Sequence, residues 1–474
     1  MTRLTLMACA LALAGCALGP DYRRPDLDVP AVYRSADSGG AVAALDSQWW
    51  KQFGDPALDA LVVEAVANNR NLQVAVANVE RAAGALTQTR SALFPQLNYS
   101  AQGEKARASE RGASPLPSVI PNPSTSYQAV AAASWELDLW GKIRRQTEAA
   151  QASLLATEEA RRGVVLSLVS SVVSTYIQLL SLDEQLEIAR RTTQTYDESL
   201  KLFELQFKYG VVSQINVAQA RSQYEGAQAS IPQLRLQITQ TENALSILLG
   251  RNPAPVARSK TLSQLSMPTV PGDLPSQLLT RRPDVLAAEQ QLVAANAQIG
   301  AARALYFPSI SLTGALGGAS ADLSDLFKGP ARVWNYAGSI TGPIFNAGAI
   351  SGQVQQAEAG QKAALASYES AVQSAFADVD NSLAARLRVG EQMAAQGRLV
   401  DALRDYSRLA RLQYGAGYAP YYAVLQAEQS LFPQELSYAG TRASSLIAVV
   451  NLYKAMGGGW IEQAAALSLS SKQP

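Results

Sequence analysis

Two stretches of this 474-residue chain pass from the period of a helix to the period of a strand at a Phe-Pro pair. Apolar residues recur at helical spacing from Pro283 to Leu305, and beyond Phe307-Pro308 they alternate with hydroxyl residues. The same passage occurs at Phe94-Pro95, 213 positions earlier (307 − 94), where it ends a continuous helix predicted from about Pro56 to Leu93. Proline lacks the N–H that continues a helix, so each pair predicts a helix end. The chain is therefore an internal duplication, in which each repeat joins a helix to a strand with one apolar face.

Four strands are predicted, two in each repeat. In the second predicted strand, which belongs to the first repeat, Tyr127, Trp135 and the alanines between them alternate with polar residues. Long alternation with aromatic residues near its ends is typical of transmembrane barrel strands, whose apolar side faces lipid. The alternative is an ordinary half-buried antiparallel strand. The predicted strands are about 96–104, 127–139, 309–317 and 333–345.

Four strands per chain are too few for a closed barrel, because known membrane barrels have about eight or more. An open sheet edge is not tolerated in lipid, so the barrel must be shared between chains. Two chains would give eight strands and an interior filled by side chains, whereas three would give twelve strands and room for a channel.

Each pair of strands is followed by a very long helix. Residues 141–209 contain no proline, and apolar residues recur there at coiled-coil spacing. A helix of this length extends roughly 100 Å at 1.5 Å per residue. A similar pattern runs from about 348 to 414, and each long helix is followed by a break and a return helix. We expect these helices to continue the barrel as a tunnel into the periplasm.

Composition shifts divide the chain into six segments. The apolar run at the start indicates a signal peptide, and the Pro- and Gly-rich stretches indicate an extended arm and a linker. The predicted segments are a signal peptide (1–15), a lipid-anchored extended arm (16–55), the first repeat (56–249), a crossover linker (250–275), the second repeat (276–456) and a loose tail (457–474).

The first residues, MTRLTLMACALALAGC, have the charged and apolar regions of an export signal. Their end, Leu13-Ala14-Gly15-Cys16, is similar to a bacterial lipobox, which implies cleavage before Cys16 and its acylation, for example with palmitate. The alternative is an ordinary signal peptide with an incidental cysteine. Ala17, in place of Asp, favours the outer membrane by the same resemblance. No transmembrane helix is expected in the mature chain.

Composition argues against several functions. The chain has no histidine, which removes the commonest general base and metal ligand, and only two cysteines. Its net charge of +1 gives no support to nucleic-acid binding. The acidic pair Asp378 and Asp380 is expected on a solvated helix surface. We therefore expect no enzyme activity, no catalytic residue, no metal site and no cofactor.

Four stretches carry a resemblance that covers nearly the whole mature chain. They are CALGPDYRRP, WWKQFGDPALDALV, SWELDLWGKIRR and LPSQLLTRRPDVLAAEQQLVAANAQIGAARALYFPSISL. The chain resembles the TolC/OprM outer-membrane factors, in particular the lipoprotein branch that serves RND-type pumps. This resemblance implies an α+β membrane protein that forms a homotrimer, with a twelve-stranded β-barrel continued by a helical coiled-coil tunnel.

The resemblance also implies function and partners. It predicts a passive exit duct for multidrug efflux in the bacterial outer membrane, joined through a periplasmic adaptor (membrane fusion protein) to an inner-membrane RND pump. Two other cargoes remain open, namely metal ions or a polypeptide exported by a type I system. Outside the channel class, the alternative is a structural coiled-coil lipoprotein, although this would leave the four alternating strands unexplained.

By residue-by-residue match, the periplasmic gate and adaptor-docking tips lie at the two helix breaks. Family members often carry acidic residues at positions that are uncharged here, so the resemblance implies a gate built from tyrosines and amides. The alternative is a pair of solvated turns with no gating role. Pro95 and Pro308 are expected where helices enter the barrel. The predicted tip residues are Tyr209, Gly210, Asn216, Tyr414, Gly417, Ala423 and Gln426.

Overall fold

The computed structural model describes residues 17–27, 29–30, 32–35, 48–109, 111, 121–269 and 278–458. The chain forms two compact units, and each is described by itself. Unit 1, the strand unit, contains residues up to Asp26, Asn78–Thr157 and Ala288–Tyr368. Unit 2, the helical unit, contains Leu27–Ala77, Glu158–Ala287 and the residues from Glu369 onward.

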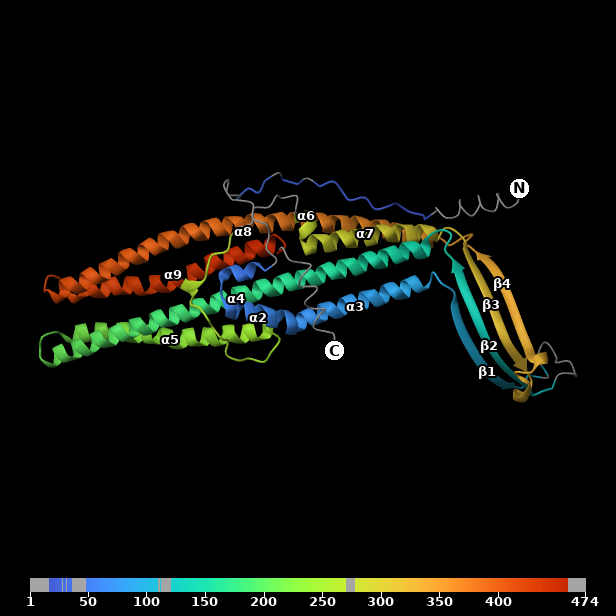
Figure 1. Ribbon diagram of the computed structural model, residues 1–474, viewed down its shortest axis with the longest axis horizontal. Helices are drawn as coiled ribbons and strands as arrows, with labels where there is room; N and C mark the ends of the chain where they lie inside the picture. Colours follow the sequence, from blue (N-terminus) through green and yellow to red (C-terminus); the bar gives the residue numbers. More distant parts are fainter. Residues whose placement is uncertain are drawn as a thin grey trace. The chain divides into compact units, whose positions relative to one another are not determined.

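The elements follow one another in two similar series (Figure 1). The first series is η1 (Trp49–Phe53), α2 (Pro56–Asn68), α3 (Arg70–Ser91), β1 (Gln96–Ala106), β2 (Ser124–Leu137), α4 (Lys142–Lys208), α5 (Gln214–Leu248) and η2 (Leu262–Gln264). The second is α6 (Leu278–Arg281), α7 (Pro283–Ala304), β3 (Ser309–Ser320), η4 (Leu323–Asp325), η5 (Gly329–Ala331), β4 (Arg332–Thr341), α8 (Ala349–Gly415) and α9 (Tyr421–Ala455).

The predicted duplication is confirmed by the lengths of matching helices. Helices α3 and α7 each have 22 residues and start 213 positions apart (283 − 70). Helices α4 and α8 each have 67 residues, α5 and α9 each have 35, and both pairs are offset by 207 positions (349 − 142 and 421 − 214). The segment boundaries proposed from composition stay predictions.

The four strands form one antiparallel sheet in the order β1-β2-β3-β4, so β1 and β4 are its edges. The register places Tyr99 beside Ala131, Ala131 beside Leu316 and Leu316 beside Trp334. Successive residues of a strand point to opposite faces, so this row and its alternate neighbours, which include most of the large apolar residues, share one face. Tyr99 is 91% exposed and Tyr336 81%. An exposed apolar face of this kind is the lipid-facing side of a membrane barrel, as predicted.

Strand bounds differ slightly from expectation. Strand β2 begins at Ser124 and ends at Leu137, while β4 ends at Thr341. Pro343, which has no N–H for the ladder, follows soon after the end of β4 and accounts for the early stop.

The helical unit has an ordinary apolar core. The predicted coiled-coil seam of α4 is buried, with Val169, Val172 and Tyr176 fully inaccessible to solvent. Helix α4 contains an 18-residue stretch with mean hydropathy 1.8, long and apolar enough to cross a membrane, and 61% of that stretch is buried within the chain. Packing against α2, α5 and α9 accounts for this apolarity.

One predicted helix is in fact two. The continuous helix expected from about Pro56 to Leu93 is interrupted at Asn69, whose ψ of 129° is extended. The Asn69 side chain accepts from the Leu72 N–H at 3.0 Å and donates to the Leu248 carbonyl at 2.8 Å. Asn69 thus ends α2 and caps α3, because an asparagine side chain competes well with the backbone for hydrogen bonds at helix starts.

The register generates a labelling prediction. Ser311 pairs with Ser339, and their hydroxyls lie 3.0 Å apart on the polar face, whereas Leu312 lies on the apolar face. In the membrane-embedded protein, a cysteine at position 311 should react with a water-soluble thiol reagent, and a cysteine at 312 should be shielded by lipid. Equal labelling of both positions would contradict this register.

Candidate gate at the helix breaks

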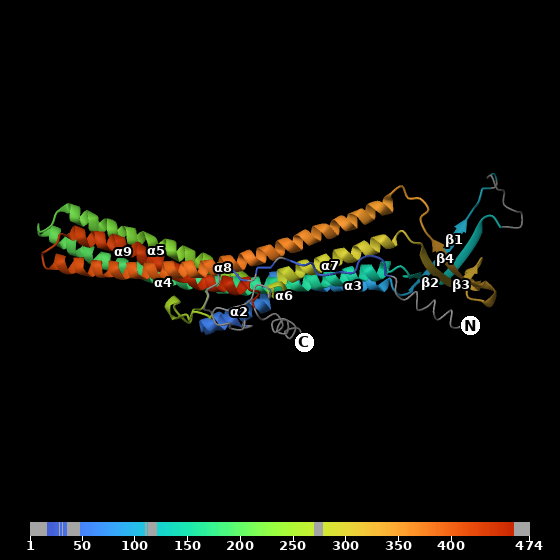
Figure 2. The ribbon, with the colours of Figure 1, turned by 90° about the horizontal axis from the view of Figure 1, so that it is seen from above.

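The two long hairpins of the helical unit turn by the same backbone device. Gly210, after α4, has φ +72°, and Gly417, after α8, has φ +78°. The Val211 N–H returns to the Gln206 carbonyl, and the Tyr418 N–H returns to the Gln413 carbonyl, both at 2.9 Å. Left-handed glycines with such return bonds end helices tightly, because a Cβ would be strained at that φ. Figures 1 and 2 show both turns at the same end of the hairpins.

Beside these turns, side chains from α4, α5, α8 and α9 pack into one apolar group, called here the tip cluster. Its centre is aromatic, with ring centroids 4.0 Å apart for Phe203 and Tyr421 and 5.4 Å apart for Tyr414 and Tyr421. Aromatic pairs at such separations stabilise beyond simple burial. The cluster joins the two hairpins. Its buried members are Leu200, Phe203, Ala220, Ala410, Tyr421, Val424, Leu425 and Ala427.

Three of the seven predicted tip residues are partly buried, and the other four are exposed. Tyr414 packs against the tip cluster, and Ala423 is partly buried beside it. Asn216 lies in the first turn of α5, where its side-chain oxygen accepts from the Ser213 hydroxyl at 2.7 Å. The remaining residues, Tyr209, Gly210, Gly417 and Gln426, are exposed.

An ion pair between an exposed arginine and a buried glutamate adjoins the tip cluster and was missed from the sequence. Arg411 of α8 donates to Glu428 of α9 at 2.6 and 2.7 Å, and Glu428 is only 4% exposed. Burial raises the pKa of the Glu428 carboxyl, and the charge of Arg411 opposes this rise without cancelling it. Burial and the neighbouring Glu428 likewise raise the pKa of the Tyr421 hydroxyl to about 12. The helical spacing of Tyr421, Val424 and Glu428 could have revealed that this glutamate is on the buried face.

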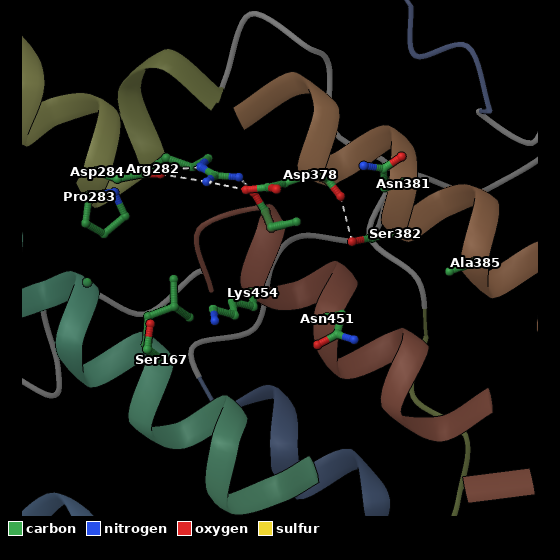
Figure 3. Close-up of a pocket in the computed structure, with 13 residues that line it drawn as sticks. Ser167, Arg282, Pro283, Asp284, Asp378, Asn381, Ser382, Ala385, Asn451 and Lys454 are labelled. Atoms are coloured by element: carbon green, nitrogen blue, oxygen red, sulfur yellow. Dashed lines mark hydrogen bonds and ion pairs between the residues drawn. The ribbon is translucent and has the colours of Figure 1, made fainter. Parts of the chain in front are cut away.

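A second polar group lies deeper in the helical unit. Arg282, at the α6–α7 junction, is 7% exposed and donates to Asp284 at 2.6 Å and to Asp378 at 2.8 Å. It also donates to the Ala455 carbonyl at 3.0 Å. These residues line a cavity of about 460 Å³. Arg282, Asp284 and Asp378 are labelled in Figure 3. The guanidinium is fully engaged by protein groups and therefore ties α7, α8 and α9 together.

Asp378 is exposed on the surface of α8, as expected, and Asp380 is partly buried there. Each carboxylate nevertheless has a partner within the helical unit, which was not expected. Asp378 pairs with the buried Arg282, and Asp380 accepts from the Ser35 N–H at 2.8 Å. Both carboxylates lie on α8, but their partners come from segments distant in sequence. Helix periodicity cannot predict such pairings.

In the strand unit, the two junction prolines directly precede strands. Pro95 comes before β1, and Pro308 comes before β3. The Pro308 carbonyl accepts from the Trp140 indole at 2.8 Å, and the Trp140 ring stacks on Phe307 with centroids 4.8 Å apart. This contact fixes the angle at which the chain leaves α7 for the sheet. The predicted acylation site, Cys16, lies outside the described residues.

The Glu428 carboxyl generates a prediction about pH. Its folded pKa is above its unfolded value, so between the two the folded state binds more protons. The free energy of unfolding at the tip should therefore increase as pH falls through the folded pKa, and Glu428→Gln should remove that part of the dependence. Amide hydrogen exchange in α9, corrected for its intrinsic pH dependence, measures this free energy of unfolding in the unmodified protein and in the Glu428→Gln variant. Identical pH profiles would contradict the assignment.

Comparison with known proteins gives consistent matches. Residues 61–251 and 274–458 match the family model of the outer membrane efflux protein. The "Probable efflux pump outer membrane protein TtgC" of Pseudomonas putida is 38% identical, over 97% of this chain and 96% of its own. The "Cation efflux system protein CusC" of Escherichia coli is 36% identical, over 97% and 99%.

Solved structures agree with these matches. The open-state MtrE outer membrane channel of Neisseria gonorrhoeae has a TM-score of 0.85 and 33% identity, covering 94% of this chain and 99% of its own. The CmeC outer membrane channel of Campylobacter jejuni has a TM-score of 0.88 and 26% identity, covering 96% and 98%.

Proposed function

Because the chain belongs to the outer membrane efflux protein family, we propose that it is the passive exit duct of a tripartite pump, joined by a periplasmic adaptor to an inner-membrane RND transporter. It is an outer-membrane efflux channel, built as a trimer around a shared barrel. The observation that carries the proposal is the sheet itself, with an exposed apolar face and two open edges, followed in the chain by helices of 67 residues. The duct performs no catalysis of its own.

The helix breaks are proposed as the gate and as the adaptor-docking end. They are the turns that join the long helices of each hairpin, and the tip cluster holds the two hairpins together. Tyr414 links the turn after α8 to Phe203 of α4, with centroids 6.3 Å apart. Asn216, Ala423 and Gln426 bring no charge to this end. The gate is therefore held shut mainly by packing and neutral hydrogen bonds around Tyr414.

A neutral gate should bind multivalent cations weakly. A ring of carboxylates from three chains would focus a strong negative potential in a narrow opening, and uncharged residues create none. In single-channel recordings of the purified protein, a trivalent cation on the periplasmic side should block poorly. The Ala423→Asp, Gln426→Asp double variant should be blocked tightly, and Tyr414→Ala should raise the open probability without changing the salt dependence. Strong block of the unmodified channel, relieved by high salt, would contradict the neutral gate.

Docking is tested at the turns. Leucine at both Gly210 and Gly417 would be strained, because each glycine has a left-handed φ. The double variant should lose drug resistance in a host that supplies pump and adaptor, while expression and trimer formation persist. The matched control is Gly390→Leu, since no atom lies within 4 Å of a Cβ added there. Resistance that survives the double change would show that the adaptor docks elsewhere.

The cargo is proposed to be apolar small molecules and drugs. This rests on the relative named as a toluene efflux component, at 38% identity. Metal-ion efflux is the second candidate, because the named cation efflux relative is 36% identical over 97% of this chain. Susceptibility of a channel-deficient host to solvents, antibiotics and metal salts, with each type of pump supplied, separates the two. Rescue against metal salts alone would favour the second.

The N-terminus is proposed to be acylated at Cys16, which would add a lipid anchor to the barrel. The support is the lipobox-like LAGC after an apolar run. Mass spectrometry of the mature protein decides the matter, since an unmodified Cys16 would refute it.

A further inference from the structure

The connection between β3 and β4 folds back onto the sheet. Gly318 is buried near the outer end of β3, although its neighbours in sequence are more exposed. A Cβ added to Gly318 would meet the Leu326 carbonyl oxygen, and the Leu326 side chain is itself only 6% exposed. Glycine is therefore required at this position, because it lets the connection lie directly against the strand.

The covered face is the apolar one. The register joins Ala129 to Gly318 and Gly318 to Arg332, one row from Leu316 and Trp334. Alternate residues of a strand share a face, so Gly318 points to the same side as Leu312 and Leu316. The connection thus extends the lipid-facing surface of the sheet. It leaves two large apolar side chains uncovered, Leu323 at 63% and Phe327 at 86% exposure.

Two cations occupy the same side at the outer ends of the edge strands. Lys105 shares its face with Tyr99 in β1, and Arg332 shares its face with Trp334 in β4. Both are exposed, and neither side chain has a hydrogen bond or ion pair with any other residue in the described ranges. Closing the shared barrel brings β1 of one chain beside β4 of the next, since these are the two edges. The two cations then meet at the outer rim of each seam.

Cations on the lipid-facing side of a barrel are costly in the acyl region and tolerated near the interface. There they pair with phosphate groups, while adjacent aromatic and leucine side chains enter the boundary of the acyl chains. We propose that Lys105, Arg332 and the connection bearing Leu323 and Phe327 bind a phosphate-bearing glycolipid of the outer leaflet. The apolar connection continues the lipid-facing surface, and the two cations complement the headgroup charge.

The first test measures lipid binding by the purified trimer. Native mass spectrometry should show binding of diphosphorylated lipid A and weaker binding of its dephosphorylated form. One basic residue near a lipid surface contributes about 5-fold. The Lys105→Gln, Arg332→Gln double variant should therefore bind the phosphorylated form roughly 25-fold more weakly. The control Arg388→Gln, an exposed cation on α8, should bind normally. Unchanged binding by the double variant would overturn the proposal, and competition by inorganic phosphate alone would show an anion site instead.

The second test locates the connection without removing any charge. A nitroxide attached at Phe327→Cys in reconstituted trimers should be relaxed by oxygen and protected from a water-soluble nickel chelate. The same label at Arg388→Cys, an exposed position on α8, reports the aqueous reference. Accessibility of position 327 to the chelate equal to that of 388 would place the connection in water, as a lid over the opening, and would overturn the lipid assignment.

Discussion

The structure depends on one constraint, that backbone N–H and C=O groups cannot remain unpaired in hydrocarbon. The sheet of each chain has four strands in sequential order, so the ladders of β1 and β4 are open on one side. Neither edge is covered within the sheet, and the exposed apolar face shows that the sheet belongs in lipid. Pairing β1 with β4 of a neighbouring chain satisfies both edges at once. Oligomerisation is therefore a requirement of the fold.

The two units use apolar residues in opposite ways. In the sheet, Tyr99, Trp334 and Tyr336 are exposed, because their solvent is lipid. In the helical unit, residues of the same kind such as Trp49 and Tyr453 are buried and stacked, with ring centroids 5.0 Å apart. The contrast becomes visible when the exposure of each residue is combined with the strand register. Hydropathy alone does not separate the exposed aromatic residues of the sheet from the buried ones of the helical unit.

Much of the fold could be predicted because it is periodic. The Phe-Pro pairs, the strand alternation and the 207-residue offset are local or repeated signals, and the helices and strands lie close to where they predict. The break at Asn69 was missed because the helical pattern continues through it, and only the contact with the Leu248 carbonyl fixes it. Arg282 and Glu428 were missed because their partners lie 96 and 17 residues away, on other helices. At the candidate gate, the sequence singled out Tyr414 but not the Phe203 and Tyr421 rings that pack with it.

The central claim is that three chains close one barrel through their β1 and β4 edges. Its most direct test uses variants in which every chain carries one cysteine in β1 and one in β4, at a series of registers. Non-reducing electrophoresis then detects disulfides between the β1 cysteine of one chain and the β4 cysteine of another. The two strands are separated by β2 and β3, so a bond within one chain cannot form. The account predicts covalent species that grow to three chains and stop there. Species that stop at two chains, or no cross-link at any register, would contradict it.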